Sequence, residues 1–159
     1  MKDRELKIKN LPVAIRQRSA SRIAAVQLHF QYLFVEGDLE ISLAEYLKHY
    51  SSDVAKEMNV RDIDVPYFKK LVFDCKIHEV LIREVISSSL ARGWNIDRLS
   101  KADLTILLVA ICELKNMAKT PVKVIIKEYT AIADAYNSDV SFINAILDKV
   151  ARKLRAREI

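Results

Sequence analysis

The chain has 159 residues, of which 51% are hydrophobic and 30% charged, and its formal net charge is +5. This composition is typical of a globular protein and excludes a disordered or collagen-like chain. Because only two glycines and three prolines are present, helix breakers are scarce, and an all-α fold is predicted.

The first predicted helix covers residues 16–35. Its apolar residues recur at spacings of three and four and predict one buried face: Ile23, Val26, Phe30 and Phe34. Beside this face runs a second strip with two guanidinium groups and an imidazole: Arg18, Arg22, Ala25 and His29. We expect residues 1–15 to be a basic N-terminal extension, disordered in part, and residues 16–159 to be a single helical domain.

The middle of the chain predicts two further helical regions. One runs from Ser42, a suitable N-cap, to Lys56. The other covers residues 66–91, with Pro66 near its first turn. Its apolar pattern fits one long helix or two helices with a break near Lys76.

Three helices are predicted in the C-terminal half. Ser100 is expected to cap a helix that is apolar nearly all round and therefore the most enclosed. Thr120 and Pro121 open the next helix. The last helix begins near Phe142 and places five apolar residues on one face: Ile143, Ile146, Leu147, Val150 and Leu154. Six or seven helices with short connections predict a compact bundle.

The positive charge is concentrated at the two ends of the chain. Residues 1–22 carry seven lysines and arginines against two acidic residues, and residues 149–159 carry five against one. If the two ends meet in the fold, they form one basic surface that attracts polyanions. The alternative is that both ends are solvated tails that serve solubility.

Phe142 lies at the border of the buried face of the last helix. Lys149 and Lys153, seven and eleven residues later, project on the same side. A single-stranded nucleic acid would stack a base on the ring and place phosphates near the lysines. The same group would also suit a partner protein, or Phe142 could pack under the preceding loop.

No catalytic motif is recognisable. The three histidines lack the HExxH spacing, and two glycines can hardly supply a phosphate-binding loop. Cys75 and His78 have a spacing compatible with a metal, and Cys112 is a conceivable third ligand. A buried thiol beside a histidine is commoner, so neither a metal nor a cofactor is predicted.

The chain is expected to be cytoplasmic and not to enter a membrane. Its first ten residues are polar and mixed in charge, unlike a secretory signal peptide. The longest apolar run, ILLVAIC, is too short to span a bilayer. Cys75 and Cys112 are therefore predicted to be free thiols, with a disulfide as the alternative.

The segments RLSKADLTILLVAICELKN and TPVKVIIKEYTAIADAYNSDVSFINAILDKVA resemble the NusB family of transcription antitermination factors. Upstream, DIDVPYFKKLV and SRIAAVQLHF are similar to the family's third and first helices. The C-terminal matches are Arg98, Leu99, Ile106, Leu107, Ala110, Glu113, Leu114, Pro121, Lys123, Val124, Ile126, Glu128, Phe142, Asn144, Leu147, Asp148 and Lys149. The chain departs from the family pattern at Ser19, Ala20 and Leu108, where arginines are common, and at Lys127 and Ala145.

The resemblance implies an all-helical, non-enzymatic protein made of two small helical bundles. It implies binding of boxA-like single-stranded RNA together with the ribosomal protein NusE, within the antitermination complex of RNA polymerase. The family includes homodimers, so a homodimer is a further partner. By position, Arg22 matches the arginine-rich, RNA-contacting start of the family, and Phe142 matches a site near RNA or partner. Gln27 matches the same family segment as Arg22 and is a further candidate for RNA binding.

Charge and helix geometry add four further candidates for RNA binding: Arg16, Arg18, Lys149 and Lys153. We expect charge reversal of Arg18 and Arg22 to weaken RNA binding without unfolding the chain. Two other functions remain open. One is a protein-only scaffold, and the other is a stand-alone relative of the NusB-like domain of some RNA cytosine methyltransferases. Because no cofactor-binding domain follows Ile159, no methyl transfer by this chain is expected.

Overall fold

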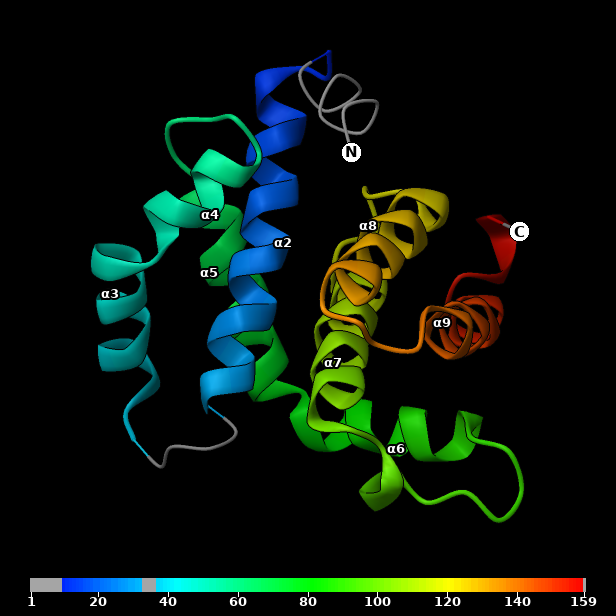
Figure 1. Ribbon diagram of the computed structural model, residues 1–159. Coiled ribbons are helices and arrows are strands. Elements are labelled where there is room, and N and C mark those ends of the chain that lie inside the picture. The colour runs from blue at the N-terminus through cyan, green and yellow to red at the C-terminus, as the bar shows by residue number, and fades with distance from the viewer. Residues whose placement is uncertain (1–9, 33–36, 159) are drawn as a thin grey trace. The chain divides into compact units, whose positions relative to one another are not determined.

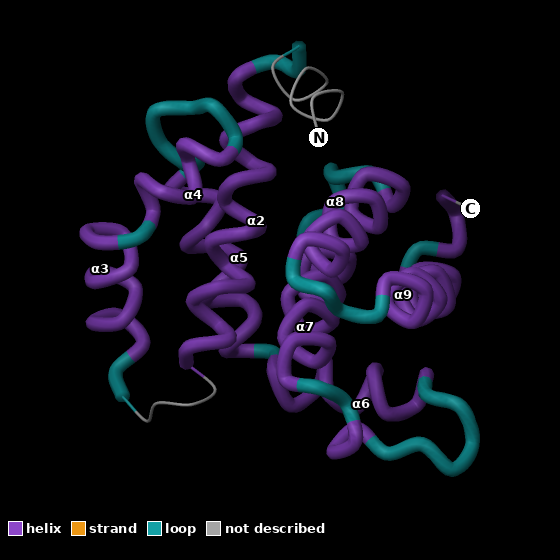
Figure 2. Tube along the Cα trace, viewed as in Figure 1, coloured by secondary structure: helices purple, strands orange, loops and turns teal. Residues whose placement is uncertain are grey.

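The computed structural model describes residues 10–32 and 37–158. These residues form eight α-helices and two short 3-10 helices, with no strand among them (Figure 1, Figure 2). The chain divides into two compact units, residues 1–72 and 73–159. The predicted all-α class and the two small bundles are thus confirmed. No helix in the described part of the chain has the length and apolar character needed to cross a bilayer.

The first unit contains α2 (Val13–Tyr32), which packs against α3 (Leu39–His49) and α4 (Ser51–Glu57). α5 (Val65–Ile77) begins in this unit and continues into the second. Alanines at positions 20, 24 and 25 of α2 are fully or almost fully buried. Because these side chains are small, the neighbouring helices can approach α2 closely.

The buried surface of α2 differs from the predicted stripe. Val26 is buried as expected, but Phe30 is exposed, and Phe34 lies outside the described residues. Arg22 and His29, which belong to the predicted second strip, are each only 3% exposed. Small residues on several sides of α2 allow it to be covered over much of its circumference, which a single apolar stripe does not reveal. α2 also begins at Val13, inside the expected N-terminal extension, of which residues 1–9 lie outside the described residues.

The predicted helix 42–56 is in fact two helices, α3 and α4, which are separated at Tyr50. Asp38, and not Ser42, caps α3, because its carboxylate accepts a 2.8 Å hydrogen bond from the Glu40 backbone N–H. Tyr50, at the junction of the two helices, is 49% exposed. Because the Asp38 carboxylate caps the helix, α3 begins at Leu39, three residues earlier than the apolar pattern alone indicates.

The helical region 66–91 consists of two helices, α5 and α6 (Glu79–Ser89), which meet at His78. The alternative with a break was therefore correct, and Pro66 lies in the first turn of α5 as predicted. Ile82 and Ile86 of α6 are fully buried, whereas Leu81 is 45% exposed. The break at His78 interrupts the helical periodicity, so the apolar pattern does not continue in register from α5 to α6.

The second unit is organised around α7 (Lys101–Asn116), which packs against α6, α8 (Val122–Ala135) and α9 (Val140–Leu154) (Figure 1). Every residue from Thr105 to Leu114 is buried, so α7 is the enclosed helix that was predicted. Ser100 caps it, since its hydroxyl oxygen accepts a 3.0 Å hydrogen bond from the Asp103 N–H. Two 3-10 helices complete the unit: η1 (Ile96–Arg98) and η2 (Ala156–Glu158).

Candidate nucleic-acid interface

In the first unit, two arginines of α2 face one tyrosine of α5. The Cζ atoms of Arg18 and Arg22 each lie 5.4 Å from the ring centroid of Tyr67. Arg22 also donates a hydrogen bond from Nη2 to the Tyr67 hydroxyl, at 3.3 Å. The 5.4 Å distance between each Cζ atom and the ring centroid is short enough for attraction between a cation and the π face of the ring. The arrangement holds two guanidinium groups together, although like charges four residues apart on a helix cost about 0.2–0.5 kcal/mol.

Asp64 links Arg18 and Ser21 of α2 to the start of α5. Its Oδ1 accepts a 3.2 Å hydrogen bond from the Tyr67 backbone N–H, and its Oδ2 lies 3.9 Å from Arg18 Nε. The backbone carbonyl oxygen of Asp64 accepts a hydrogen bond from the Ser21 hydroxyl at 2.9 Å. Asp64 thus orders the helix start and also places a negative charge beside Arg18.

Only Arg18 of the three candidate arginines presents its side chain to solvent, with 55% of the side chain exposed. Arg22 is 3% exposed, so reversal of its charge would place a carboxylate in a buried position. The expectation that charge reversal of Arg22 leaves the fold intact therefore does not follow from the structure. Arg18 is the position at which charge and folding can be separated.

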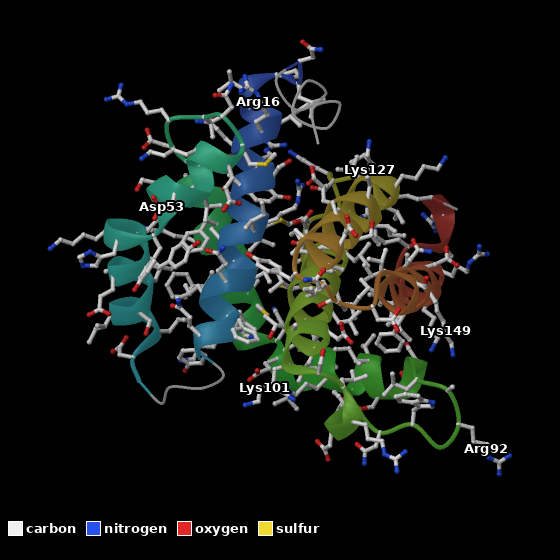
Figure 3. All side chains as sticks on the ribbon, viewed as in Figure 1. Arg16, Asp53, Arg92, Lys101, Lys127 and Lys149 are labelled. Carbon is white, nitrogen blue, oxygen red and sulfur yellow. The ribbon has the colours of Figure 1, made fainter. Side chains whose placement is uncertain are left out.

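Arg16 has two backbone partners. Nε donates to the Leu11 carbonyl oxygen at 2.9 Å, and Nη1 donates to the Asn59 carbonyl oxygen at 2.6 Å. The residue is 9% exposed and lies near the start of α2 (Figure 3). These contacts connect the first turn of α2 to the loop after α4, so Arg16 stabilises the fold of the first unit.

Gln27 is half-buried, and its Oε1 accepts a 2.6 Å hydrogen bond from the Tyr46 hydroxyl. Tyr46 is 1% exposed, and its ring centroid lies 5.5 Å from that of Phe68. A buried hydroxyl needs a partner, and Gln27 supplies the acceptor. The Gln27 carbonyl oxygen is thereby directed into the first unit.

In the second unit, α9 carries the other three candidates. Phe142 is half-buried, while Lys149 and Lys153 are exposed. The Lys149 ammonium donates a 3.1 Å hydrogen bond to the Ser89 carbonyl oxygen, at the end of α6. This contact places a cation at a helix C-terminus, which the helix dipole favours. Lys149 therefore joins two helices and still reaches solvent.

Part of the C-terminal charge is neutralised within the unit. Arg152 Nε lies 3.0 Å from Asp148 Oδ2, on the preceding turn of α9. Arg155 is paired with Glu158 and donates from Nη2 to the Ala118 carbonyl oxygen at 3.0 Å. The hydrogen bonds from Arg155, together with one from the Val122 N–H, lower the pKa of the Glu158 carboxyl. Fewer cations than the sequence suggests are thus left for a polyanion.

The structure brings the candidates together within each unit. Arg18 and Arg22 share the Tyr67 ring, and Lys149 and Lys153 lie one turn apart on α9. The union of the two basic ends into one surface concerns different units and stays a prediction. Tyr67 and Asp64 were not among the predicted site residues. Both lie in the DIDVPYF segment, but nothing local in that segment indicates that α2 places arginines beside it.

The two cysteines are free and buried, as predicted. A hydrogen bond with the Cys112 side chain, followed by burial, raises the pKa of the Cys75 thiol well above its usual range. Within residues 10–32 and 37–158, no group of three or more histidine, cysteine, aspartate or glutamate residues is arranged to hold a metal ion.

Residues 19–152 match the NusB family of proteins. The chain belongs to the NusB family. A transcription antitermination protein NusB of Clostridium botulinum (strain Alaska E43 / Type E3) is 33% identical over 138 residues, which cover 86% of this chain and 98% of that protein. The match to the NusB family spans both units and every candidate residue except Arg16, Arg18 and Lys153.

Solved structures of NusB proteins have the same fold. T. maritima NusB superposes with a TM-score of 0.70 at 27% identity, covering 93% of this chain and 96% of that chain. A crystal structure of the antitermination factors NusB and NusE in complex with double-stranded RNA gives a TM-score of 0.70 at 21% identity. It covers 87% of this chain and 98% of that chain, and it supports the NusB fold alone.

Proposed function

We propose that this chain is a transcription antitermination factor that binds boxA-like single-stranded RNA together with the ribosomal protein NusE. It acts without catalysis, in the cytoplasm, as an adaptor within the antitermination complex of RNA polymerase. The observation that carries the proposal is the match to the NusB family over residues 19–152. A relative named transcription antitermination protein NusB aligns with this chain along almost its whole length. This favours an antitermination factor over a methyltransferase domain.

The geometry supports an RNA-binding role in two places. Arg18 offers an exposed guanidinium beside the Tyr67 ring, and α9 carries two exposed lysines as well as the half-buried ring of Phe142. Cations attract the phosphates of RNA, and aromatic rings and guanidinium planes stack on unpaired bases. Arg16, Arg22 and Gln27 are engaged inside the first unit, so their support for RNA binding is indirect.

The decisive experiment is a titration with a fluorescent single-stranded RNA that carries a boxA-like element. A scrambled RNA of equal length and a duplex of the same sequence are the controls. We expect the boxA-like strand to bind more tightly than both, with an affinity that falls steeply as salt rises. Equal affinity for all three RNAs would reduce the interaction to general attraction of polyanions and would contradict the proposal.

A second titration adds the ribosomal protein NusE. The proposal predicts that the RNA affinity rises when NusE is present, because both proteins contact one RNA. The alternative function, a protein-only scaffold, predicts that NusE is bound while the RNA titrations stay flat. Light scattering with and without RNA tests whether a homodimer hides the basic surface.

Variants of α9 test the second group of candidates. Lys153→Ala removes an exposed cation and should reduce the salt dependence of RNA binding by about one unit of log-log slope. Phe142→Ala should weaken binding at all salt concentrations if the ring stacks on a base. If Phe142→Ala lowers the melting temperature and leaves the affinity unchanged, the ring only packs at the start of α9.

A further inference from the structure

We propose that Tyr67 is a positioning residue for RNA binding, which holds the Arg18 guanidinium in the orientation that meets the RNA. The inference rests on the proposed function and deepens it. Tyr67 itself is half-buried, and its ring serves as the platform for Arg18 and Arg22. The ligand chemistry is that of single-stranded RNA, with a phosphate or a base plane in contact with the guanidinium.

The first step of the argument is the contrast between the two arginines. Arg22 is buried and donates to the Tyr67 hydroxyl, so it fixes the ring relative to α2. Arg18, one turn earlier, has 55% of its side chain exposed and yet lies at the same 5.4 Å distance from the ring centroid. A long, exposed arginine is normally disordered among many rotamers. Contact with the ring removes part of that freedom before any ligand arrives.

The second step is electrostatic. Two guanidinium groups one turn apart repel each other, and repulsion alone would drive Arg18 away into solvent. The ring face and the Asp64 carboxylate, 3.9 Å from Arg18 Nε, oppose this repulsion. At that distance the carboxylate is a loose partner and does not form a close two-point pair with the guanidinium. Arg18 is therefore oriented by the ring and keeps its donors accessible to a phosphate.

The third step is the cost of binding. A cation that is already oriented loses less conformational entropy when RNA binds, so preorganisation strengthens binding without a new contact. Loss of the ring should therefore weaken RNA binding through Arg18, although Tyr67 does not touch the RNA. A purely structural role for Tyr67 predicts a different result. Loss of the ring would then lower the stability of the chain, and the coupling energy between Tyr67 and Arg18 in RNA binding would be zero.

The experiment measures RNA affinity for the full chain and three variants at Tyr67. Tyr67→Phe keeps the ring and should stay within about twofold of wild type, whereas Tyr67→Met fills similar space without a π face and should bind about fivefold more weakly. Tyr50→Leu is the matched control, because it removes an exposed tyrosine of the same unit that pairs with Tyr46 and His49. It should leave the affinity unchanged. Melting curves establish that each variant is folded at the assay temperature.

A double-mutant cycle then tests the link to Arg18. If Tyr67 acts through Arg18, the Arg18→Ala, Tyr67→Met double variant should bind no more weakly than Arg18→Ala alone. Independent, additive losses would overturn the inference. So would wild-type affinity for Tyr67→Met. Absence of RNA binding by the wild-type chain would overturn the proposed function and this inference with it.

Tyr67→Trp is the third variant, and it keeps the test decisive if Tyr67→Met does not fold. Tryptophan offers a larger π face to a cation, so the Tyr67→Trp variant should bind RNA at least as tightly as wild type. A loss as large as that of Arg18→Ala, in a folded Tyr67→Trp chain, would overturn the inference.

Discussion

The guanidinium of Arg16 in α2 donates a 2.6 Å hydrogen bond to the backbone carbonyl oxygen of Asn59, which follows α4. Asn59 has a φ of 53°, in the left-handed region that few side chains adopt readily. Arg16 thus satisfies a carbonyl group at a turn that departs from ordinary helix geometry. One arginine thereby connects two segments that are 43 residues apart.

Arg16→Ala should destabilise the first unit by about 2 kcal/mol, because two backbone carbonyl oxygens lose a charged donor. Urea unfolding measures the effect. Arg61→Ala, at an exposed position of the same unit, is the control and should change stability by less than about 0.5 kcal/mol. A loss of RNA affinity at unchanged stability would instead assign Arg16 to RNA.

Asp64→Asn should strengthen RNA binding. Asparagine keeps an oxygen that can accept the Tyr67 N–H, but it removes the negative charge beside Arg18. We expect the dissociation constant to fall about two- to threefold at low salt, in keeping with the weak energy of exposed ion pairs. The gain should shrink as salt rises. An unchanged affinity at low salt would mean that Arg18 does not meet the RNA.

The buried pair of Glu113 and Tyr129 joins α7 to α8. The Tyr129 hydroxyl donates a 2.9 Å hydrogen bond to Glu113 Oε1, and both residues are fully buried. Tyr129→Phe should cost about 1–3 kcal/mol, because a buried carboxylate loses a donor. Combined with Glu113→Gln in a double-mutant cycle, it should show a coupling of at least about 0.5 kcal/mol. Strictly additive losses in urea unfolding would contradict this role for the pair.

Glu158 makes part of the stability of the second unit dependent on pH. Its Oε2 accepts a 3.3 Å hydrogen bond from the Val122 N–H, and Arg155 donates to its other oxygen. Because the pKa is lower in the folded chain, the carboxylate stabilises the fold at pH values above its ordinary pKa of 4.5 and loses this effect as the pH falls through the lowered pKa. Wild type should melt at a higher temperature than Glu158→Gln at pH 7, and the two melting temperatures should converge at low pH. A constant difference would exclude the ionised carboxylate as the cause.

The thiols of Cys75 and Cys112 should resist alkylation in the native state. Both are buried, and the raised pKa of Cys75 keeps its thiol protonated at neutral pH. Treatment with iodoacetamide at about pH 7.5 should modify neither residue until denaturant is added. Rapid modification of Cys75 in the folded chain would indicate that α5 and α7 separate readily.

Several helix starts and one buried helix face could be predicted from the local sequence pattern. Ser100 caps α7, Pro66 lies in the first turn of α5, and the buried face of α9 contains Ile143 and Val150 as expected. These features depend on side chains within one turn of each other, so helix periodicity and capping chemistry suffice. Asp38 was missed because its capping oxygen lies outside the stretch that shows apolar periodicity.

The candidate site could be predicted only in part. Charge and the family resemblance selected Arg18, Lys149 and Phe142, whose side chains are at least partly accessible. They also selected Arg16 and Arg22, whose burial depends on partners far away in the chain. The residues next to an arginine in the sequence do not determine whether its guanidinium is exposed to solvent or buried.

The order and spacing of residue types along the chain are enough to predict the all-helical class, the enclosed helix α7 and the family. They do not indicate which arginines of α2 face solvent or which ring these arginines share, because both depend on contacts between segments far apart in the sequence. Tyr67 lies near the start of α5 and reaches Arg18 and Arg22 of α2 only in the folded chain, and the energy of a cation beside a ring depends on their distance in space.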